Sequence, residues 1–334
     1  KMGFKVFVQS GAGSGASYSD ADYKKNGAQI SSKLSDLYSK ANVVVKVQRP
    51  LKNKKTNEFN YLKNCNILTL LYEQKFKVEF NSLKKLNVNV FALEKMPRIS
   101  RAQSMDILSS QSNLSGYKAV IDAASIFNKA FPLMMTSAGT VAPAKVLIIG
   151  AGVAGLQAIA TAKRLGAVVS SFDVRSSTKE QVESLGAKFI EVKGEGSGET
   201  AGGYAKEMSK SYKKKQAVLL EENLTKMDIV ITTALIPGKP SPQIISKKMV
   251  DNMKIGSIII DLASEFGGNC ELTKHGETVE YKSKKIIGPV NLPSSVSQDS
   301  SRLFSKNVLN FMINSCDAGK FLSFKWEDEV VKET

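Results

Sequence analysis

The sequence predicts an α/β protein with two doubly wound, parallel-sheet domains, a cleft between them, and long helices that join them. Strand-like runs alternate with helical patterns from the start of the chain, which is typical of parallel βαβ units. After a long amphipathic stretch at about 106–131 the alternation starts again. In addition, a glycine-rich turn directly follows the first strand-like run of the second half. These observations favour two domains of similar architecture.

The first half contains four apolar runs rich in β-branched residues. They predict strands at 5–9, 42–47, 66–71 and 88–94, with helical segments at 32–40 and 79–87 between them. A helix is predicted at 297–316 and a further strand at 320–326, and we expect this part of the chain to return to the first domain. The first domain is therefore assigned to residues 1–112 and 317–334, and the connecting helix and linker to 113–140.

The second half, assigned to a domain at 141–296, has the same alternation. Its predicted strands lie at 145–150, 167–173, 187–192, 228–234 and 256–263. Ligands of open α/β sheets bind outside the carboxyl ends of the strands, and with two such sheets the cleft between them is the natural site. The polar stretch PRISRAQSMD at 97–106 follows the strand at 88–94, so we expect it to lie at that site.

Gly150, Gly152 and Gly155 form a G-x-G-x-x-G pattern between an apolar strand and a helix, which is the context of a Rossmann-like dinucleotide site. The first glycine permits a tight turn, the second lets the backbone approach a pyrophosphate, and the third lets the helix pack on the strand. Asp173 ends the next strand, where a carboxylate accepts the adenosine-ribose hydroxyls. Because a carboxylate repels a 2′-phosphate, NAD(H) is favoured over NADP(H), although Arg175 weakens this preference slightly.

A second glycine pattern occurs near the start of the chain. Gly11, Gly13 and Ala16 have the same spacing and also follow a strand-like run. However, the next strand ends in Gln48 and Arg49 rather than in an acid, and the residues after the glycines favour caps and turns over an immediate helix. We predict a turn here.

Composition argues against several functions. The net charge of +16 suggests nucleic-acid binding, but the lysines are scattered and their densest runs lack interleaved aromatic residues, so we expect no nucleic acid. Cys65, Cys270 and Cys316 are far apart and His275 is the only histidine, so we expect three buried thiols and no metal site. No apolar run reaches the roughly 18 residues of a membrane span.

The single histidine also bears on the chemistry. Dehydrogenases that oxidise an alcohol or amine usually place a base near the nicotinamide, and His275 lies in a polar segment typical of an exposed turn. A tyrosine or lysine could still serve as base. Hydride exchange between two nicotinamides needs no such proton transfer, and amide and guanidinium groups like those of 97–106 suit its positioning. Alternatively, Ser104 or Asp106 caps the helix that follows.

Several longer motifs carry a family resemblance. PRISRAQSMDILSSQSNLSGYKAVIDAA, VLIIGAGVAGLQAIATAKRLGA, DVRSSTKEQVESLGAKF, AGGYAKEM and TTALIPGKPSPQ together resemble the NAD(H)-binding domain I, in the alpha subunit, of the Re/Si-specific, proton-translocating NAD(P) transhydrogenases. The resemblance covers almost the whole chain. It implies transfer of hydride from NADH to NADP⁺, coupled to proton movement in the full enzyme.

The resemblance also implies roles for individual residues. Those around the nicotinamide are Arg98, Gln103, Asp106 and Ser109. Those at the pyrophosphate are Gly152, Val153 and Gly155, and those on the adenosine side are Asp173, Val174 and Arg175. The floor of the pocket is formed by Thr233, Ala234 and Leu235, and Gly203 and Gln216 match further positions associated with the nucleotide.

A glycine-rich segment at 193–204 precedes a helical pattern. Five of its residues are glycines, which favours a flexible lid, and by resemblance Tyr204 lies at the tip of a mobile loop that closes over bound nucleotide. The alternative is a disordered linker.

The partners follow from the resemblance as well. NADP(H) is expected on an NADP(H)-binding partner domain, proton movement in a transmembrane domain, and the chain itself in a homodimer, so that it is incomplete alone. The expected location is a soluble domain at the matrix or cytosolic face of an energy-coupling membrane, either a mitochondrial or other organellar inner membrane or a bacterial one. The chain begins with Lys1 rather than methionine, and we expect a fragment that lacks the family's first strand.

Two alternatives stay open. The related alanine dehydrogenases share the architecture, which leaves a stand-alone amino-acid dehydrogenase as one alternative. They have a substrate-binding histidine shortly after the strand equivalent to 66–71, where this chain reads LYEQKFKVEF, whereas Lys46 matches both branches. The other alternative, a non-catalytic NADH-binding sensor or scaffold, leaves the polar groups of 97–106 unexplained.

Overall fold

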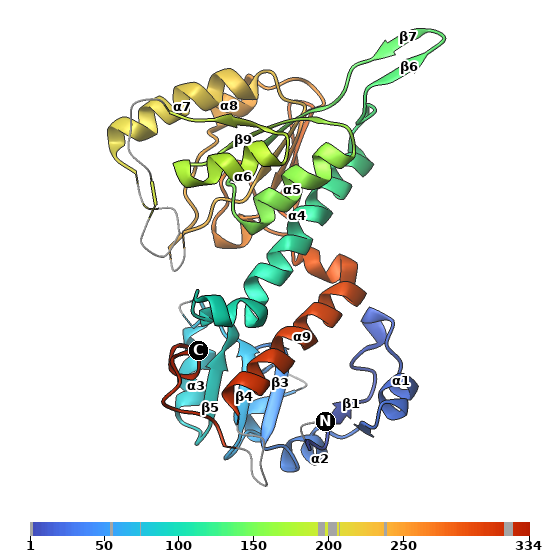
Figure 1. The fold of residues 1–334 in the computed structure, drawn as a ribbon, viewed down its shortest axis with the longest axis vertical. Coiled ribbons are helices and arrows are strands. Elements are labelled where there is room, and N and C mark those ends of the chain that lie inside the picture. Colours follow the sequence, from blue (N-terminus) through green and yellow to red (C-terminus); the bar gives the residue numbers. More distant parts are fainter. Residues whose placement is uncertain are drawn as a thin grey trace. The chain divides into compact units, whose positions relative to one another are not determined.

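The computed structural model describes residues 3–53, 56–73, 75–192, 198–199, 206, 208–236, 239–316 and 323–334. The chain divides into two compact units (Figure 1). Unit 1 comprises Lys1–Gln111 and Val296–Thr334, and unit 2 comprises Ser112–Ser295. The predicted α/β class with parallel sheets is confirmed in both units. Among the described residues, no helix combines the length and apolar character that a membrane crossing requires.

Unit 2 is built on one seven-stranded sheet with the order β10-β9-β8-β11-β12-β14-β13. The first six strands in this order are parallel, and β13 pairs antiparallel with β14. The sequence order therefore reverses between β8 and β11, and in open α/β sheets this reversal marks the ligand site. The strands are β8 (Lys145–Ile149), β9 (Val168–Phe172), β10 (Lys188–Ile190), β11 (Ile229–Thr232), β12 (Ile258–Asp261), β13 (Thr278–Tyr281) and β14 (Lys284–Ile287).

Both faces of this sheet are covered by helices, which explains why its strands are continuous apolar runs. Successive side chains of β8 enter opposite cores: Val146 and Ile148 belong to one cluster, Leu147 and Ile149 to the other. The first cluster includes residues of α4 (Ile107–Ile126), α5 (Val153–Arg164) and α6 (Lys179–Ser184). The second includes residues of α7 (Lys210–Leu224) and α8 (Lys247–Asp251). The unit also contains the short 3-10 helices η5 (Ser176–Thr178), η6 (Ser264–Phe266) and η7 (Leu292–Val296).

A hairpin that the sequence did not predict extends from unit 2 (Figure 1). Its strands are β6 (Met134–Thr136) and β7 (Gly139–Val141), and within the described part of the chain they pair only with each other. Apolar side chains on and beside it are exposed, with Leu133 at 59% and Met135 at 85%. The stretch expected to be a connecting linker thus contains a two-stranded sheet with little packing of its own.

Unit 1 differs from the single doubly wound sheet that the sequence predicts. One sheet has the parallel order β3-β4-β5, and a separate parallel pair is formed by β1 and a strand β2 that was not predicted. The strands are β1 (Phe7–Gln9), β2 (Gln29–Ser31), β3 (Val43–Gln48), β4 (Asn66–Leu70) and β5 (Asn89–Ala92). The register of β3 shifts after Val45, and Val45 and Val47 are about half exposed, so β3 ends its sheet. The three residues of β1 make their ladder with β2 instead.

The helices of unit 1 fill in the predicted pattern. The predicted helical segments at 32–40 and 79–87 form α2 and α3, and the predicted helix at 297–316 forms α9. The helices are α1 (Asp20–Lys25), α2 (Leu34–Ser39), α3 (Lys77–Lys84), α9 (Ser297–Ser315) and α10 (Glu329–Glu333). The 3-10 helices are η1 (Ser14–Ala16), η2 (Glu58–Asn60), η3 (Leu93–Lys95) and η4 (Ser100–Met105).

The glycine pattern near the start of the chain forms the predicted turn. It leads into η1, and α1 begins only after Ser19, whose side chain caps it at the amide of Asp22.

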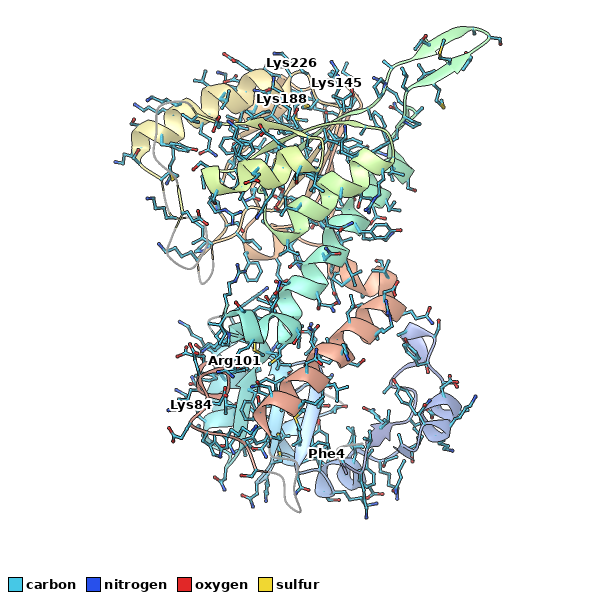
Figure 2. All side chains as sticks on the ribbon, viewed as in Figure 1. Phe4, Lys84, Arg101, Lys145, Lys188 and Lys226 are labelled. Atoms are coloured by element: carbon cyan, nitrogen blue, oxygen red, sulfur yellow. The ribbon has the colours of Figure 1, made fainter. Side chains whose placement is uncertain are left out.

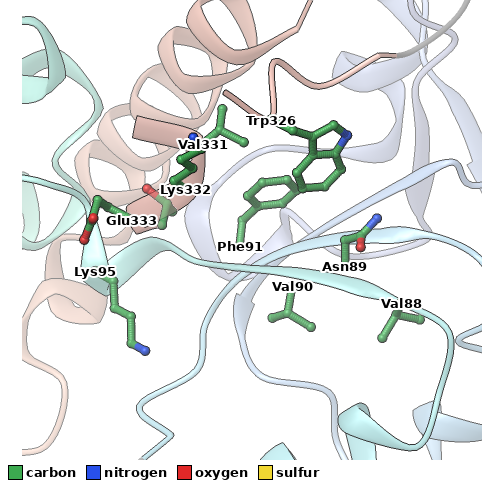
Figure 3. A pocket seen from close by; sticks show the side chains of 10 residues that line it. Val88, Asn89, Val90, Phe91, Lys95, Trp326, Val331, Lys332 and Glu333 are labelled. Atoms are coloured by element: carbon green, nitrogen blue, oxygen red, sulfur yellow. The ribbon is translucent and has the colours of Figure 1, made fainter. Parts of the chain in front are cut away.

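The strand predicted at 320–326 is wrong for its described part. Phe324 forms only an isolated bridge with Cys316, and the chain continues into α10. The reason is local packing, since Phe324 and Trp326 lie against the Phe91 ring, with centroid separations of 4.5 and 5.9 Å. These rings border a pocket of about 440 Å³ at the outer edge of β5 (Figure 3).

Candidate nucleotide-binding site

The glycine turn after β8 has the geometry that its pattern predicts. Gly150 has φ +99°, a conformation that favours glycine, and a Cβ on it would lie 2.6 Å from Oγ1 of Thr233. A Cβ on Gly155 would lie 1.8 Å from the carbonyl oxygen of Gly150, so α5 packs on the turn only with glycine there. A Cβ on Gly152 would meet no atom of the described residues within 4 Å. The first and third glycines thus serve packing, whereas the second faces open space.

Gly152 is also the N-cap of α5. It provides no side-chain hydrogen bond to the first turn, and Val153, the first residue of the helix, is 38% exposed. The first amides of a helix lack partners within it and carry positive potential. The open space beside Gly152 therefore suits an anionic group, and a pyrophosphate fits this cradle.

Asp173 follows β9 and is buried, but its carboxylate is already engaged. Oδ2 accepts from the amide of Ala151 at 2.6 Å and from Nη2 of Arg175 at 2.8 Å. Oδ1 accepts from the amide and Nε of Arg175, at 2.8 and 3.0 Å. The hydrogen bond from Arg175 to Asp173 in turn raises the pKa of the guanidinium.

This ion pair changes the argument for cofactor choice. The sequence suggested that Arg175 weakens the repulsion of a 2′-phosphate only slightly, whereas the structure pairs it closely with Asp173. Much of the negative charge is thereby compensated. Ribose hydroxyls would have to share or replace hydrogen bonds that the carboxylate makes within the chain.

The other residues predicted on the adenosine side are less informative. Val174 is half-buried, and its carbonyl accepts from the amide of Gly198 at 2.9 Å. Gln216 is buried on α7. Gly203 and Tyr204 lie outside the described residues, as does most of the predicted lid at 193–204, so the structure does not place them.

The loop after β11 lies beside the glycine turn. The amide of Thr233 donates to the carbonyl of Ile149 at 2.8 Å, and its Oγ1 donates to the carbonyl of Gly150 at 2.9 Å. Leu235, two residues on, is 41% exposed. The structure thus brings the predicted floor residues and the predicted pyrophosphate turn to one edge of the sheet, at the reversal between β8 and β11.

Two buried polar residues that sequence reasoning missed hold this edge together. The side chain of Asn269 binds both backbone groups of Ala234, accepting from its amide at 3.0 Å and donating to its carbonyl at 2.8 Å. Asp261 ends β12, and its fully buried carboxylate accepts five hydrogen bonds, from the amides of Ala263, Asn269 and Cys270 and the hydroxyls of Thr232 and Thr273. An acid at the end of a predicted strand was the available signal.

The polar stretch at 97–106 lies in unit 1. Arg98 and Gln103 are exposed, on the loop before η4 and on η4 itself. Asp106 caps α4, accepting from the amide of Ser109 at 2.9 Å and from its hydroxyl at 2.5 Å. The capping alternative is therefore confirmed for Asp106. It is wrong for Ser104, whose carbonyl instead accepts amide hydrogen bonds from α9.

The remaining titratable groups add no obvious reactive centre within the described residues. His275 is exposed, with Nδ1 3.1 Å from the hydroxyl of Ser264. The three cysteines are free and buried, as predicted, and burial raises the pKa of the Cys270 thiol to about 11. Within the described ranges, no cluster of three or more His, Cys, Asp or Glu side chains could hold a metal ion. The arrangement is suited to binding and orienting a dinucleotide.

Comparison with known proteins gives a consistent result. The family model "Alanine dehydrogenase/PNT, N-terminal domain" matches residues 1–115, and "Alanine dehydrogenase/PNT, C-terminal domain" matches 119–334. The chain is 54% identical over 338 residues to an NAD(P) transhydrogenase subunit alpha protein of Rhodospirillum rubrum, covering 100% of this chain and 88% of that protein. It is 27% identical over 327 residues to the alanine dehydrogenase of Mycolicibacterium smegmatis, covering 96% and 81%. The crystal structure of a transhydrogenase from Sinorhizobium meliloti matches with a TM-score of 0.89 and 43% identity, covering 100% of this chain and 89% of that one.

Proposed function

Because the chain belongs to the alanine dehydrogenase/PNT family, we propose that it is the NAD(H)-binding component of a Re/Si-specific, proton-translocating NAD(P) transhydrogenase. The structural observation that carries the proposal is the open cradle at Gly152, where a helix N-terminus meets a glycine turn at the reversal point of the sheet. The relative from Rhodospirillum rubrum, similar over the whole chain, supports this reading over the more distant alanine dehydrogenases.

In this proposal each part of the edge has a role in binding. The amides at Gly152 and Val153 bind the pyrophosphate, with Gly150 and Gly155 shaping the turn. The adenosine side is bound by Asp173, Val174 and Arg175, with Gly203 and Gln216 nearby. Thr233, Ala234 and Leu235 form the floor, and Tyr204 closes over the nucleotide.

The groups of 97–109 act on the nicotinamide as a positioning clamp in this proposal. Bound NADH supplies the hydride, and no proton has to move at the reacting carbons. Arg98 and Gln103 are exposed and able to bind the carboxamide of the ring. Asp106 and Ser109 hold the start of α4 through their mutual hydrogen bonds, and so support the segment that carries Gln103. Rate enhancement then comes from orientation rather than from a titrating base.

The remaining proposals concern partners. An NADP(H)-binding domain accepts the hydride and a transmembrane domain carries the protons, at the matrix or cytosolic face of an energy-coupling membrane. The words "subunit alpha" in the name of the Rhodospirillum rubrum relative support a multi-subunit enzyme. We also propose a homodimer, for which the exposed apolar hairpin around Leu133 and Met135 offers a contact surface.

The test combines this chain with a purified NADP(H)-binding domain. Hydride transfer from NADH to an NADP⁺ analogue with a distinct absorption is expected only when both proteins are present. NADH formation from alanine by this chain alone would instead support a stand-alone amino-acid dehydrogenase.

A substitution in the clamp separates the proposal from an NADH sensor or scaffold. Gln103→Asn should lower the hydride-transfer rate much more than the affinity for NADH, because the shortened amide no longer orients the ring. A sensor would show a change in binding alone.

A further inference from the structure

Helix α9 carries a buried amide within a largely apolar face. Its buried residues recur at helical spacing and include Val308, Phe311 and Met312, with Asn307 beside them. Asn307 is only 7% exposed. An amide in such a face is costly unless its hydrogen bonds are made, so the partners of Asn307 indicate its role.

Both ends of the Asn307 amide bind the segment that surrounds Asp106. Nδ2 donates to the carbonyl oxygen of Ser104 at 2.9 Å, and Oδ1 accepts from the hydroxyl of Ser110 at 2.7 Å. Ser104 belongs to η4 and Ser110 to the first turn of α4, the elements on the two sides of Asp106. One side chain of α9 therefore joins the 3-10 helix that carries Gln103 to the helix that follows it.

Packing alone does not fix the orientation of η4. Ala102 and Met105 are buried in the same core cluster as Phe311, whereas Gln103 is exposed on the other side. Apolar burial is non-directional and tolerates small rotations of a short helix. A hydrogen bond to the carbonyl of Ser104, the residue next to Gln103, constrains that rotation.

We propose that Asn307 is a positioning residue for hydride transfer, which fixes the backbone of η4 and thereby the direction of the Gln103 side chain. The inference rests on the proposed function, because it takes Gln103 to bind the nicotinamide. Productive geometry tolerates displacements of well below about 1 Å, and a misplacement of about that size costs about 10²-fold in rate. Loss of the Asn307 hydrogen bond should therefore act on the rate of transfer rather than on NADH affinity.

The chain offers two matched controls. Asn310 donates to the same Ser104 carbonyl at 3.0 Å, but it is exposed and makes no hydrogen bond to α4 within the described residues, so Asn310→Ala removes one hydrogen bond without removing the link. Val308 is buried beside Asn307 on the same helix, and Val308→Ala lowers stability through packing without touching the hydrogen bonds of η4.

The experiment measures single-turnover hydride transfer from saturating NADH, with the NADP(H)-binding domain in excess, together with NADH affinity by calorimetry and stability by denaturation. Asn307→Asp keeps the shape and the acceptor for Ser110 but replaces the donor with an oxygen that faces the Ser104 carbonyl. We expect its transfer rate to fall about 10- to 100-fold while the dissociation constant for NADH stays within about twofold. Asn310→Ala and Val308→Ala should each lose less than about threefold in rate.

Three results would overturn the inference. Asn307→Asp could transfer hydride as fast as the unmodified chain, or Val308→Ala of equal stability could lose as much rate. Absence of transfer by the unmodified chain would overturn the proposed function, and the inference with it. If Asn307→Asp does not fold, Ser110→Ala removes only the hydroxyl end of the link and should slow transfer by about three- to tenfold. An unchanged rate in that variant would equally contradict the proposal.

Discussion

The three glycines of the turn after β8 should respond differently to alanine. At Gly152 the backbone has φ −82° and ψ −167°, which alanine adopts without strain, and no atom of the described residues lies within 4 Å of an added Cβ. At Gly155 the same methyl group would lie 1.8 Å from the carbonyl oxygen of Gly150. Gly152→Ala therefore tests ligand binding alone, whereas Gly155→Ala tests the packing of α5 on its strand.

The magnitudes follow from these environments. Gly152→Ala exchanges a favourable N-cap residue for a poor one, at about 1 kcal/mol, and regains about 0.4–1 kcal/mol by restricting the unfolded chain. Its free energy of unfolding should change by less than about 1 kcal/mol. Because the new methyl group fills the space beside the first amides of α5, NADH affinity should fall at least about tenfold, or about 1.4 kcal/mol. Gly155→Ala should lose about 3 kcal/mol of stability or more.

Urea denaturation and calorimetric titration with NADH separate the two effects. Gly15→Ala is a matched control, since Gly15 also has no described atom within 4 Å of an added Cβ and lies in the glycine-rich turn before α1, where we expect no nucleotide. It should change neither stability nor affinity. If Gly152→Ala folds normally and binds NADH within about threefold of the unmodified chain, the pyrophosphate does not pass Gly152 and the site argument fails.

Three further changes test other parts of the structure. Asp261→Asn turns an amide NH₂ towards donors that now bind a carboxylate, so it should lower the free energy of unfolding by about 2–5 kcal/mol, and a loss below about 1 kcal/mol in thermal denaturation would contradict the network. Asp228 is partly buried, which raises its pKa, but hydrogen bonds from Lys254 and the amide of Lys145 (Figure 2) outweigh burial and leave the pKa below 3.8. Its stabilisation is thus present above pH 3.8 and lost as the pH falls through the lowered value, so Asp228→Asn should cost about 1–3 kcal/mol at neutral pH, and a cost that persists in strong acid would refute this. Met135→Asp places a charge on the exposed hairpin and should shift the proposed dimer towards monomer in light scattering, whereas an unchanged dimer would exclude that surface.

The sequence predicted the strands of unit 2 well because each is a continuous apolar run buried on both faces. The β13–β14 hairpin was missed because Lys282 and Ser283 both have positive φ in its turn, where the usual signal is Asn or Gly. In unit 1 the separation of β1 from β3 depends on pairing between distant segments, which periodicity does not encode.

The candidate site divides in the same way. The glycine turn is a local pattern of spacing, so its geometry could be predicted from Gly150, Gly152 and Gly155 alone. The partners of Ala234 and Ser104 could not, because Asn269 and Asn307 are far away in sequence and single asparagines carry no distinctive pattern. The engagement of Asp173 by Arg175 was also underestimated, since sequence proximity does not reveal side-chain geometry.

The Asp173–Arg175 pair bears on how long a dinucleotide remains bound. Ribose hydroxyls that reach this carboxylate exchange with hydrogen bonds from Arg175 and Ala151, so each new bond adds less free energy than it would at an unpaired acid. Differences in affinity between related sites are mostly differences in dissociation rate. We therefore expect short residence times, and a protein that must exchange its oxidised cofactor for a reduced one in every cycle gains turnover from such rapid release.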